Sequence, residues 1–133
     1  MLKITEKENK LISAVIVSAG NSTRMGGINK QFLELDGAPV IVNTITIFQR
    51  CHMIDEIIIV TRESDIDEIA KLVEKNDFYK VSNIVPGGET RQLSVYEGVT
   101  STSNIADLVV IHDGARPLVT VKVIEETIRA AAE

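Results

Sequence analysis

Four short apolar runs rich in β-branched residues alternate with segments of helical periodicity, and this alternation limits the possible folds more than any other feature of the chain. An apolar run without polar alternation is typical of a strand that is buried on both faces of a sheet. When strands alternate with helices, right-handed crossovers produce a mostly parallel sheet with helices on both faces. We therefore predict an α/β fold with a Rossmann-like, doubly wound sheet. The predicted strands are residues 11–17, 56–61, 80–85 and 107–113, and the predicted helices are residues 39–50, 64–76, 90–100 and 121–133.

Local signals mark the beginnings of these helices. Pro39 suits the first position of a helix, because its fixed φ angle is helical and its missing N–H group needs no partner there. Ser64, with Asp67 three residues later, and Thr120 are typical N-cap residues. No linker, repeat or low-complexity segment interrupts the pattern, so we expect a single domain preceded by a flexible tail over residues 1–10.

The charge and composition exclude several classes of protein. A formal net charge of −5 argues against binding of nucleic acid or of an acidic membrane through the overall field of the protein. No stretch approaches the roughly 20 apolar residues that a membrane span needs. The single cysteine, Cys51, excludes a disulfide within the chain and fits a small buried residue in a reducing compartment. We expect a cytoplasmic protein that binds any anion through local groups.

The segment SAGNSTRMGGINKQF, residues 18–32, follows the first predicted strand and is expected to bind an anion. Glycines at such a turn allow positive φ angles, and successive backbone N–H groups then form a nest for a phosphate. Arg24 and Lys30 add positive charge to the loop. Its spacing fits neither the phosphate-binding G-x-x-x-x-G-K-[ST] motif nor the dinucleotide-binding G-x-G-x-x-G motif.

A second candidate segment, PGGETRQLSV, follows the third predicted strand. In doubly wound sheets, ligands bind beyond the carboxyl ends of the strands. Gly87 and Gly88 permit a tight turn, and Arg91 and Ser94 are three residues apart on one face of the next helix. This spacing lets Arg91 and Ser94 converge on one ligand. The alternative is that the glycines form an ordinary turn and that Thr90 or Ser94 only caps the helix.

The fourth predicted strand ends in IHDGARP. Asp113 and the glycine after it place a carboxylate in the crevice, where it can hold a hard cation such as Mg²⁺. Arg116 is near enough to contact an anion that binds in this crevice, or simply to pair with Asp113. His112 is expected to be a hydrogen-bonded structural group rather than a catalytic one. The segment TRESD after the second strand is explained as the start of a helix.

Three motifs, in this order, carry a resemblance to a known family: AVIVSAGNSTRMG…KQFLELDGAPVI, GGETRQLSV and IHDGARP. They closely resemble the 2-C-methyl-D-erythritol 4-phosphate cytidylyltransferases of the non-mevalonate isoprenoid pathway. The opening loop is generic among nucleotidyltransferases, whereas RQ-x-SV and HD-x-ARP discriminate more strongly. The resemblance implies transfer of a cytidylyl group from CTP to 2-C-methyl-D-erythritol 4-phosphate. The products would be 4-diphosphocytidyl-2-C-methyl-D-erythritol and pyrophosphate, and Mg²⁺ would be the cofactor.

The resemblance also implies roles for residues of this chain. Arg24 and Lys30 would be the catalytic residues that neutralise the triphosphate of CTP, and Asp113 would hold the Mg²⁺ that bridges the phosphates. The residues that would select cytosine are Ala19, Gly20, Gly88 and Ser94. The whole set expected to bind the nucleotide is Ser18, Ala19, Gly20, Asn21, Ser22, Gly87, Gly88, Arg91, Ser94 and Asp113.

The sequence departs from the family in two ways. Ser22 stands where the family often has glycine, and Gly114 where many members have alanine. By resemblance, the family's chain also continues well past residue 133, and that part binds the acceptor and provides an arm for dimerisation. We therefore expect residues 11–133 to be the CTP-binding part of a single nucleotidyltransferase domain that is truncated. This part is expected to bind nucleotide without full activity, and the full-length enzyme to be a homodimer.

Three alternatives stay open on the sequence alone. The first is a cytidylyltransferase for ribitol 5-phosphate, because the acceptor-binding half that would decide is absent. The second is a non-catalytic nucleotide-binding module. The presence of Arg24, Lys30 and Asp113 argues against a chain that lost its catalytic function long ago. The third is an oxidoreductase domain, which is disfavoured by the missing G-x-G-x-x-G and by a second strand that ends in Thr61-Arg62 rather than in a ribose-binding acid.

Overall fold

The computed structural model of the chain describes residues 10–19, 24–25 and 28–132. The predicted tail over residues 1–10 therefore lies almost entirely outside the described residues. The same is true of three predicted nucleotide-binding residues, Gly20, Asn21 and Ser22.

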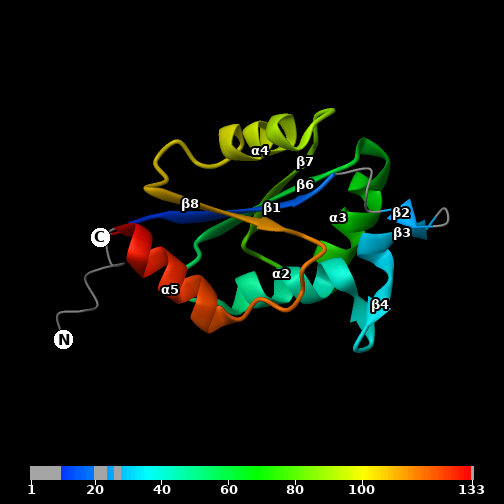
Figure 1. The fold of residues 1–133 in the computed structure, drawn as a ribbon, viewed down its shortest axis with the longest axis horizontal. Coiled ribbons are helices and arrows are strands. Elements are labelled where there is room, and N and C mark those ends of the chain that lie inside the picture. The colour runs from blue at the N-terminus through cyan, green and yellow to red at the C-terminus, as the bar shows by residue number, and fades with distance from the viewer. Residues whose placement is uncertain (1–9, 20–23, 26–27, 133) are drawn as a thin grey trace.

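A four-stranded parallel sheet forms the centre of the fold (Figure 1), as the alternation of strands and helices predicts. Its strands are β1 (Ile12–Ser18), β6 (Glu56–Thr61), β7 (Val81–Pro86) and β8 (Leu108–Asp113), in the order β7-β6-β1-β8. The chain runs outward from β1 through β6 to β7 and then returns to place β8 on the other side of β1. The strand order thus reverses between β1 and β8, and in doubly wound sheets ligands bind at such a reversal.

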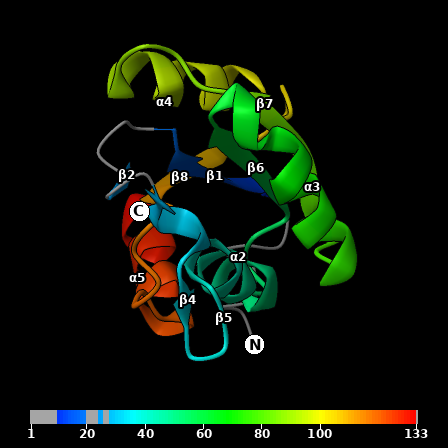
Figure 2. The same ribbon diagram turned by 90° about the vertical axis from the view of Figure 1, so that its right-hand side faces the viewer.

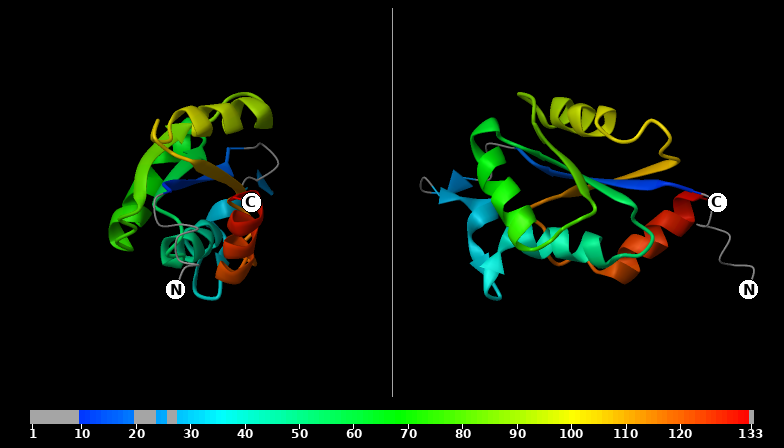
Figure 3. Two further views of the ribbon diagram at one scale, coloured as in Figure 1. Left: turned by 90° about the vertical axis from the view of Figure 1, so that its left-hand side faces the viewer. Right: turned by 180° about the vertical axis from the view of Figure 1, so that it is seen from behind.

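Helices cover both faces of this sheet (Figures 1 and 2). The helices α2 (Val40–Arg50), α3 (Ile66–Lys75) and α5 (Val121–Ala132) pack into one hydrophobic cluster, while α4 (Arg91–Thr100) covers the opposite face. Two further views show α2 and α5 together on one side of the sheet and α4 on the other (Figure 3). None of the described helices is both long enough and apolar enough to cross a membrane.

Alternate side chains of the central strands enter the two clusters. In β1, Ile12, Ala14 and Ile16 belong to the larger cluster, whereas Val15 and Val17 belong to the smaller one beneath α4. All five are at most 5% exposed. Burial on both faces is the physical reason that β1 and β6 are apolar at nearly every position, and each fully buried isoleucine stabilises the fold by about 1.5–3 kcal/mol.

The helix starts agree with the sequence signals at two positions and differ at two others. Pro39, which we predicted to be the first helical residue, is instead the N-cap of α2, with an extended ψ angle of 145°. The Thr90 and Thr120 hydroxyls accept hydrogen bonds from the backbone N–H groups of Leu93 (3.1 Å) and Val123 (3.2 Å), as N-caps do. Ser64 is not the N-cap of α3, contrary to our prediction. It lies in the 3₁₀ turn η4 (Glu63–Asp65), because Asp65 is drawn into a contact with a distant buried side chain and α3 begins after it.

Two short hairpins that the sequence analysis did not predict follow β1. The first pairs β2 (Arg24–Met25) with β3 (Ile28–Asn29), and the second pairs β4 (Glu34–Leu35) with β5 (Ala38–Pro39). The second hairpin turns at Asp36 and Gly37, whose φ angles of 56° and 85° are those of a type I′ turn. The 3₁₀ turn η3 (Lys30–Phe32) connects the two hairpins.

A charged side chain ties three strands together at the amino end of the sheet. The Glu56 carboxylate accepts hydrogen bonds from the Ser13 hydroxyl (2.5 Å), the Ser82 hydroxyl (3.0 Å) and the Ser103 backbone N–H (2.7 Å). Burial by itself would raise the pKa of Glu56, but these three hydrogen bonds outweigh it and lower the pKa below its ordinary value. The ionised carboxylate is therefore the form that joins β1, β6 and β7 most strongly.

We predict that Glu56→Gln lowers the free energy of unfolding by about 1–3 kcal/mol at pH 7, because hydrogen bonds to a charge are lost. Since the pKa is lowered on folding, the contribution is complete above the ordinary pKa of 4.5 and is lost as the pH falls through the folded-state value. Urea unfolding from pH 7 to pH 3 measures it. The exposed Glu126→Gln is the control, and a difference between Glu56→Gln and the native chain that stayed constant across this range would contradict the assignment.

Candidate functional site

The carboxyl ends of the sheet strands meet at one edge, which Figure 2 faces. Ser18 at the end of β1 lies opposite Thr61 of β6, and Thr61 lies opposite Pro86 of β7. On the other side, Val17 lies opposite Asp113 of β8. The three segments that the sequence analysis singled out therefore begin at neighbouring positions along this edge.

Short hydrogen bonds fix how the chain leaves these strands. The Gly87 N–H donates to the Thr61 carbonyl (2.8 Å), and the Gly114 N–H donates to the Val17 carbonyl (2.8 Å). The buried Ser18 hydroxyl donates to the Val60 carbonyl at 3.2 Å. Each exit loop is thus held against the end of the neighbouring strand, which gives the edge a defined backbone shape.

The double glycine after β7 lies in close contact with the first loop. A Cβ atom at Gly87 would lie only 2.4 Å from Ala19 Cβ and 2.6 Å from Ser94 Oγ, so no larger residue fits without movement. The Ser94 side chain is 3% exposed, and its hydroxyl accepts a hydrogen bond from the Gly88 N–H at 3.1 Å. The structure thus brings together Ala19, Gly87, Gly88 and Ser94, all of which the sequence analysis assigned to the nucleotide.

Arg91 differs from Ser94 in its surroundings. Its side chain is exposed at the first turn of α4 and lines a surface pocket of about 530 Å³ with Thr90, Gln92 and Val95. Ser94 instead faces inward toward the double glycine. The guanidinium is therefore available to an anion that approaches from solvent, beside the turn that Ser94 holds.

Asp113 presents its carboxylate at the end of β8. Its Oδ1 accepts a hydrogen bond from the Ala115 N–H at 3.0 Å, and its Oδ2 lies 3.7 Å from Nε of the exposed Arg116. Among the residues that the structure describes, no group of three acidic, histidine or cysteine side chains could hold a metal ion. One partly exposed carboxylate nevertheless fits Mg²⁺, which keeps several waters and binds through one or two carboxylates together with substrate phosphates.

His112 makes a hydrogen bond and a ring contact within the fold, which is consistent with the structural group that the sequence predicts. Its Nε2 lies 2.9 Å from the Arg116 carbonyl, and since a carbonyl only accepts, Nε2 carries the proton. Its ring centre lies 5.3 Å from that of the buried Phe48. The histidine therefore links the exit of β8 to α2.

The two predicted catalytic cations come from the first loop. Lys30 begins η3, where its side chain is exposed, and its ammonium has no hydrogen-bond or ion-pair partner within the described part of the chain. Arg24 lies in β2, which pairs with β3. The hairpin therefore places the Arg24 backbone beside Asn29, one residue before Lys30. The Arg24 side chain lies outside the described structure.

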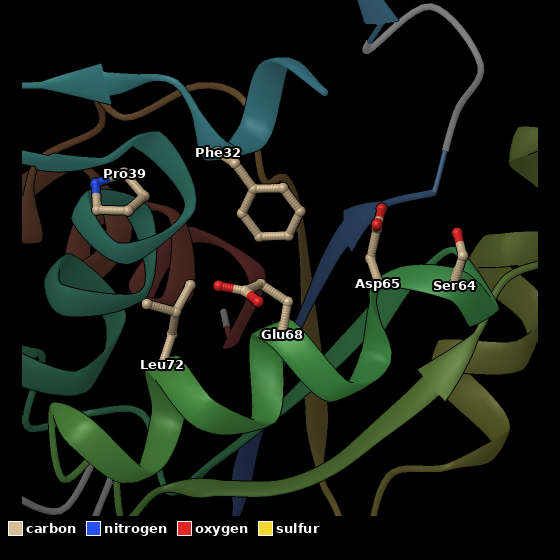
Figure 4. Close-up of a pocket in the computed structure, with 6 residues that line it drawn as sticks. All are labelled: Phe32, Pro39, Ser64, Asp65, Glu68 and Leu72. Atoms are coloured by element: carbon tan, nitrogen blue, oxygen red, sulfur yellow. The ribbon is translucent and has the colours of Figure 1, made fainter. Parts of the chain in front are cut away.

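Sequence reasoning missed one buried polar cluster at this edge. The Gln31 amide is 0% exposed and lies between Thr61 and Asp65, which the sequence analysis treated as structural. A second surface pocket of about 450 Å³ lies beside this cluster, between η3 and α3 (Figure 4). No signal in the sequence points to the cluster, because a single glutamine beside an aromatic residue has no periodicity and its partners are 30 and 34 residues away.

Comparison with known proteins gives consistent matches. A family model described as IspD, 2-C-methyl-D-erythritol 4-phosphate cytidylyltransferase, matches residues 12–133. A curated 2-C-methyl-D-erythritol 4-phosphate cytidylyltransferase of Clostridium botulinum (strain Langeland) is 44% identical over 120 residues, which are 90% of this chain and 52% of that protein. Another, from Caldanaerobacter subterraneus subsp. tengcongensis, is 45% identical over 122 residues, or 90% and 54% of the two chains.

A solved structure is similar over nearly the whole chain. The 4-diphosphocytidyl-2C-methyl-D-erythritol synthase from Anaerococcus prevotii matches with a TM-score of 0.84 and 35% identity, covering 97% of this chain and 54% of that one. The match confirms the predicted nucleotidyltransferase type of the sheet. This chain spans about half the length of the relatives that it matches.

We predict that Gly87→Ala lowers the free energy of unfolding by about 1–3 kcal/mol, because the added methyl group overlaps Ala19. The double variant Ala19→Gly/Gly87→Ala removes the overlap with Ala19 but leaves the one with Ser94 Oγ at 2.6 Å, so it is expected to recover only part of this loss. Urea unfolding of the native chain and both variants measures the effect. A Gly87→Ala chain as stable as the native one would show that this close contact is absent.

Proposed function

Because the chain belongs to the IspD family of 2-C-methyl-D-erythritol 4-phosphate cytidylyltransferases, we propose that it binds CTP with a divalent cation at the carboxyl edge of its sheet. One observation carries the proposal. The register of the parallel strands gathers Ser18, the double-glycine turn and Asp113 at one edge, and the first loop brings Lys30 to the same end of the molecule.

The triphosphate is assigned to the cationic side of this edge. Lys30 lies in the first loop with its ammonium available, and Arg24 enters from the paired strand β2. Both substrates of a cytidylyl transfer are anions, and their repulsion grows as water is excluded from a site. Lys30 and Arg24 supply the compensating charge. The sequence predicts further contacts to the phosphates from backbone N–H groups at the loop glycines, which lie outside the described residues.

Asp113 is assigned to a magnesium ion. Its Oδ2 is the oxygen that now faces Arg116, so the cation and the guanidinium compete for one side of the carboxylate. When bound, Mg²⁺ would neutralise charge on the phosphates of the nucleotide. The side chain needs no other protein ligand for this role, because the phosphates and waters provide the remaining oxygens.

The cytosine ring is assigned to the contact between the first loop and the double-glycine turn. Ala19, Gly88 and Ser94 line this contact with backbone groups and one hydroxyl. Fixed donors and acceptors distinguish the amino group of cytosine from the carbonyl oxygen of uracil at the same ring position. The resemblance to the family further implies that the base site rejects a purine.

The whole protein is proposed to catalyse attack by a phosphate oxygen of 2-C-methyl-D-erythritol 4-phosphate on the α-phosphorus of CTP. A new phosphorus–oxygen bond forms, the bond to the β-phosphate breaks, and pyrophosphate leaves. Such transfers depend on alignment and charge neutralisation rather than on covalent help from the protein. The matched stretch covers 52% of a curated relative, so we assign nucleotide binding to these residues and acceptor binding to a part that they do not match. We further propose that the whole protein acts in the cytoplasm as a homodimer.

We predict that the chain binds CTP in the presence of Mg²⁺ at least about tenfold more tightly than UTP or ATP, which corresponds to about 1.4 kcal/mol. Isothermal titration with the three nucleotides measures this. Chelation of Mg²⁺ with EDTA is expected to weaken CTP binding, and Asp113→Asn to remove most of the dependence on Mg²⁺. Equal affinity for all three nucleotides would contradict cytosine selectivity, and no binding of any of them would contradict the proposed function.

A further inference from the structure

Gln31 is a fully buried polar residue next to the exposed Lys30. Both belong to η3, a single turn in which the Leu33 N–H donates to the Lys30 carbonyl at 3.2 Å. One turn of this kind has little stability of its own, because so few backbone hydrogen bonds hold it. The position of the Lys30 backbone must therefore be fixed by contacts that η3 makes with the rest of the fold.

The Gln31 amide makes such contacts with two distant partners. Its Nε2 donates one hydrogen bond to the Thr61 hydroxyl and one to Asp65 Oδ2, each 3.2 Å long. An ionised carboxylate only accepts, so the amide must present its nitrogen to Asp65. Two N–H groups meet two buried acceptors, since Thr61 is 0% and Asp65 9% exposed. Hydrogen bonds in such surroundings are costly to break, because the separated groups would stay buried.

The partners of Gln31 belong to the edge already described. Thr61 lies opposite Ser18 and accepts the Gly87 N–H, so it sits between the first loop and the double-glycine turn. Asp65 ends η4, directly before α3. Through these two residues, the turn that carries Lys30 is joined to the middle of the carboxyl edge.

Phe32 holds the same turn from its other side (Figure 4). Its ring points from η3 toward α3, where Glu68 and Leu72 lie across the pocket from it. Phe32 is partly buried and packs against the larger hydrophobic cluster. Apolar contact places η3 over α3, but such contact is non-directional. The hydrogen bonds of Gln31 are directional, and they determine which way the turn faces.

We propose that Gln31 is a positioning residue that holds Lys30 toward the triphosphate site through Thr61 and Asp65. This inference rests on the proposed function, in which Lys30 contacts the nucleotide. Gln31 itself is buried and acts only through its neighbour. Loss of its hydrogen bonds lets η3 shift, and the ammonium then spends less time where the phosphates bind.

The decisive variant is Gln31→Glu, which keeps the shape of the side chain and places a second carboxylate against Asp65. It is expected to weaken binding of CTP with Mg²⁺ at least about tenfold in isothermal titration. Gln31→Glu/Asp65→Asn reverses donor and acceptor at the same net charge, and is expected to return the affinity to within about threefold of the native chain. If Gln31→Glu is unfolded, Gln31→Met replaces it, because it removes both bonds without adding a charge.

A double-mutant cycle with Lys30 separates positioning from general destabilisation. If Gln31 acts through Lys30, then Lys30→Ala/Gln31→Glu binds CTP no more weakly than Lys30→Ala alone. Gln49→Glu is the matched control, since this partly buried glutamine accepts a bond from the Lys80 N–H at the opposite end of the sheet, and a carboxylate keeps that acceptor. Its affinity for CTP is expected to equal that of the native chain.

Two results would overturn the proposal: a folded Gln31→Glu chain with native affinity, or losses from Lys30→Ala and Gln31→Glu that multiply in the double variant. Hydrogen exchange of the Leu33 amide in the nucleotide-free chain gives a second readout that does not depend on CTP. It is expected to become at least about tenfold faster in Gln31→Glu and to stay unchanged in Gln49→Glu. If the native chain does not bind CTP, the proposed function fails, and this exchange rate alone decides whether Gln31 positions the turn.

Discussion

The parallel pairing of β1 with β6 on one side and with β8 on the other is the constraint on which the rest of this structure depends. Parallel strands must end at the same edge, so every loop that leaves a strand carboxyl end begins within one or two strand spacings of β1. Segments that are far apart in the sequence, such as those at Ser18, Gly87 and Asp113, become neighbours for this reason alone. The hydrophobic burial of β1 and β6 on both faces is what holds the pairing in register.

The two ends of the sheet contain different kinds of polar group. At the amino end, Glu56 joins three strands through hydrogen bonds to serines, and its charge is fully engaged within the fold. At the carboxyl end, backbone hydrogen bonds and the buried Gln31 amide fix the loops, while Lys30 is exposed and the Asp113 carboxylate is partly exposed beside Arg116. A net charge of −5 provides no general attraction for an anion. Any anion at this edge must therefore be attracted by local groups such as the Lys30 ammonium.

The elements of the sheet could be predicted from the sequence because each has its own periodic signal. The strands at residues 12–18, 56–61, 81–86 and 108–113 agree with the predicted runs to within one residue, and Thr90 and Thr120 cap helices as their sequences indicate.

The hairpins of two-residue strands were missed because they are too short for any periodicity. The predicted cap at Ser64 was wrong because a tertiary contact of Asp65 overrode the local preference. The same tertiary contact hid Gln31, whose role depends on partners that only the fold brings near. The family could be recognised because three motifs occur in a particular order along the chain. The chemistry of any one motif would not have been enough to identify it.

The central claim is that the carboxyl edge of the sheet is the nucleotide-binding surface of this chain. Titration of the ¹⁵N-labelled chain with CTP and Mg²⁺, followed by amide chemical shifts, tests it most directly. The account predicts the largest changes at Ser18, Ala19, Lys30, Gly87, Gly88 and Gly114, with the amides of Glu56, Ser82 and Ser103 at the opposite end unchanged. Changes centred on that opposite end, or on the outer surfaces of α2 and α5, would contradict it.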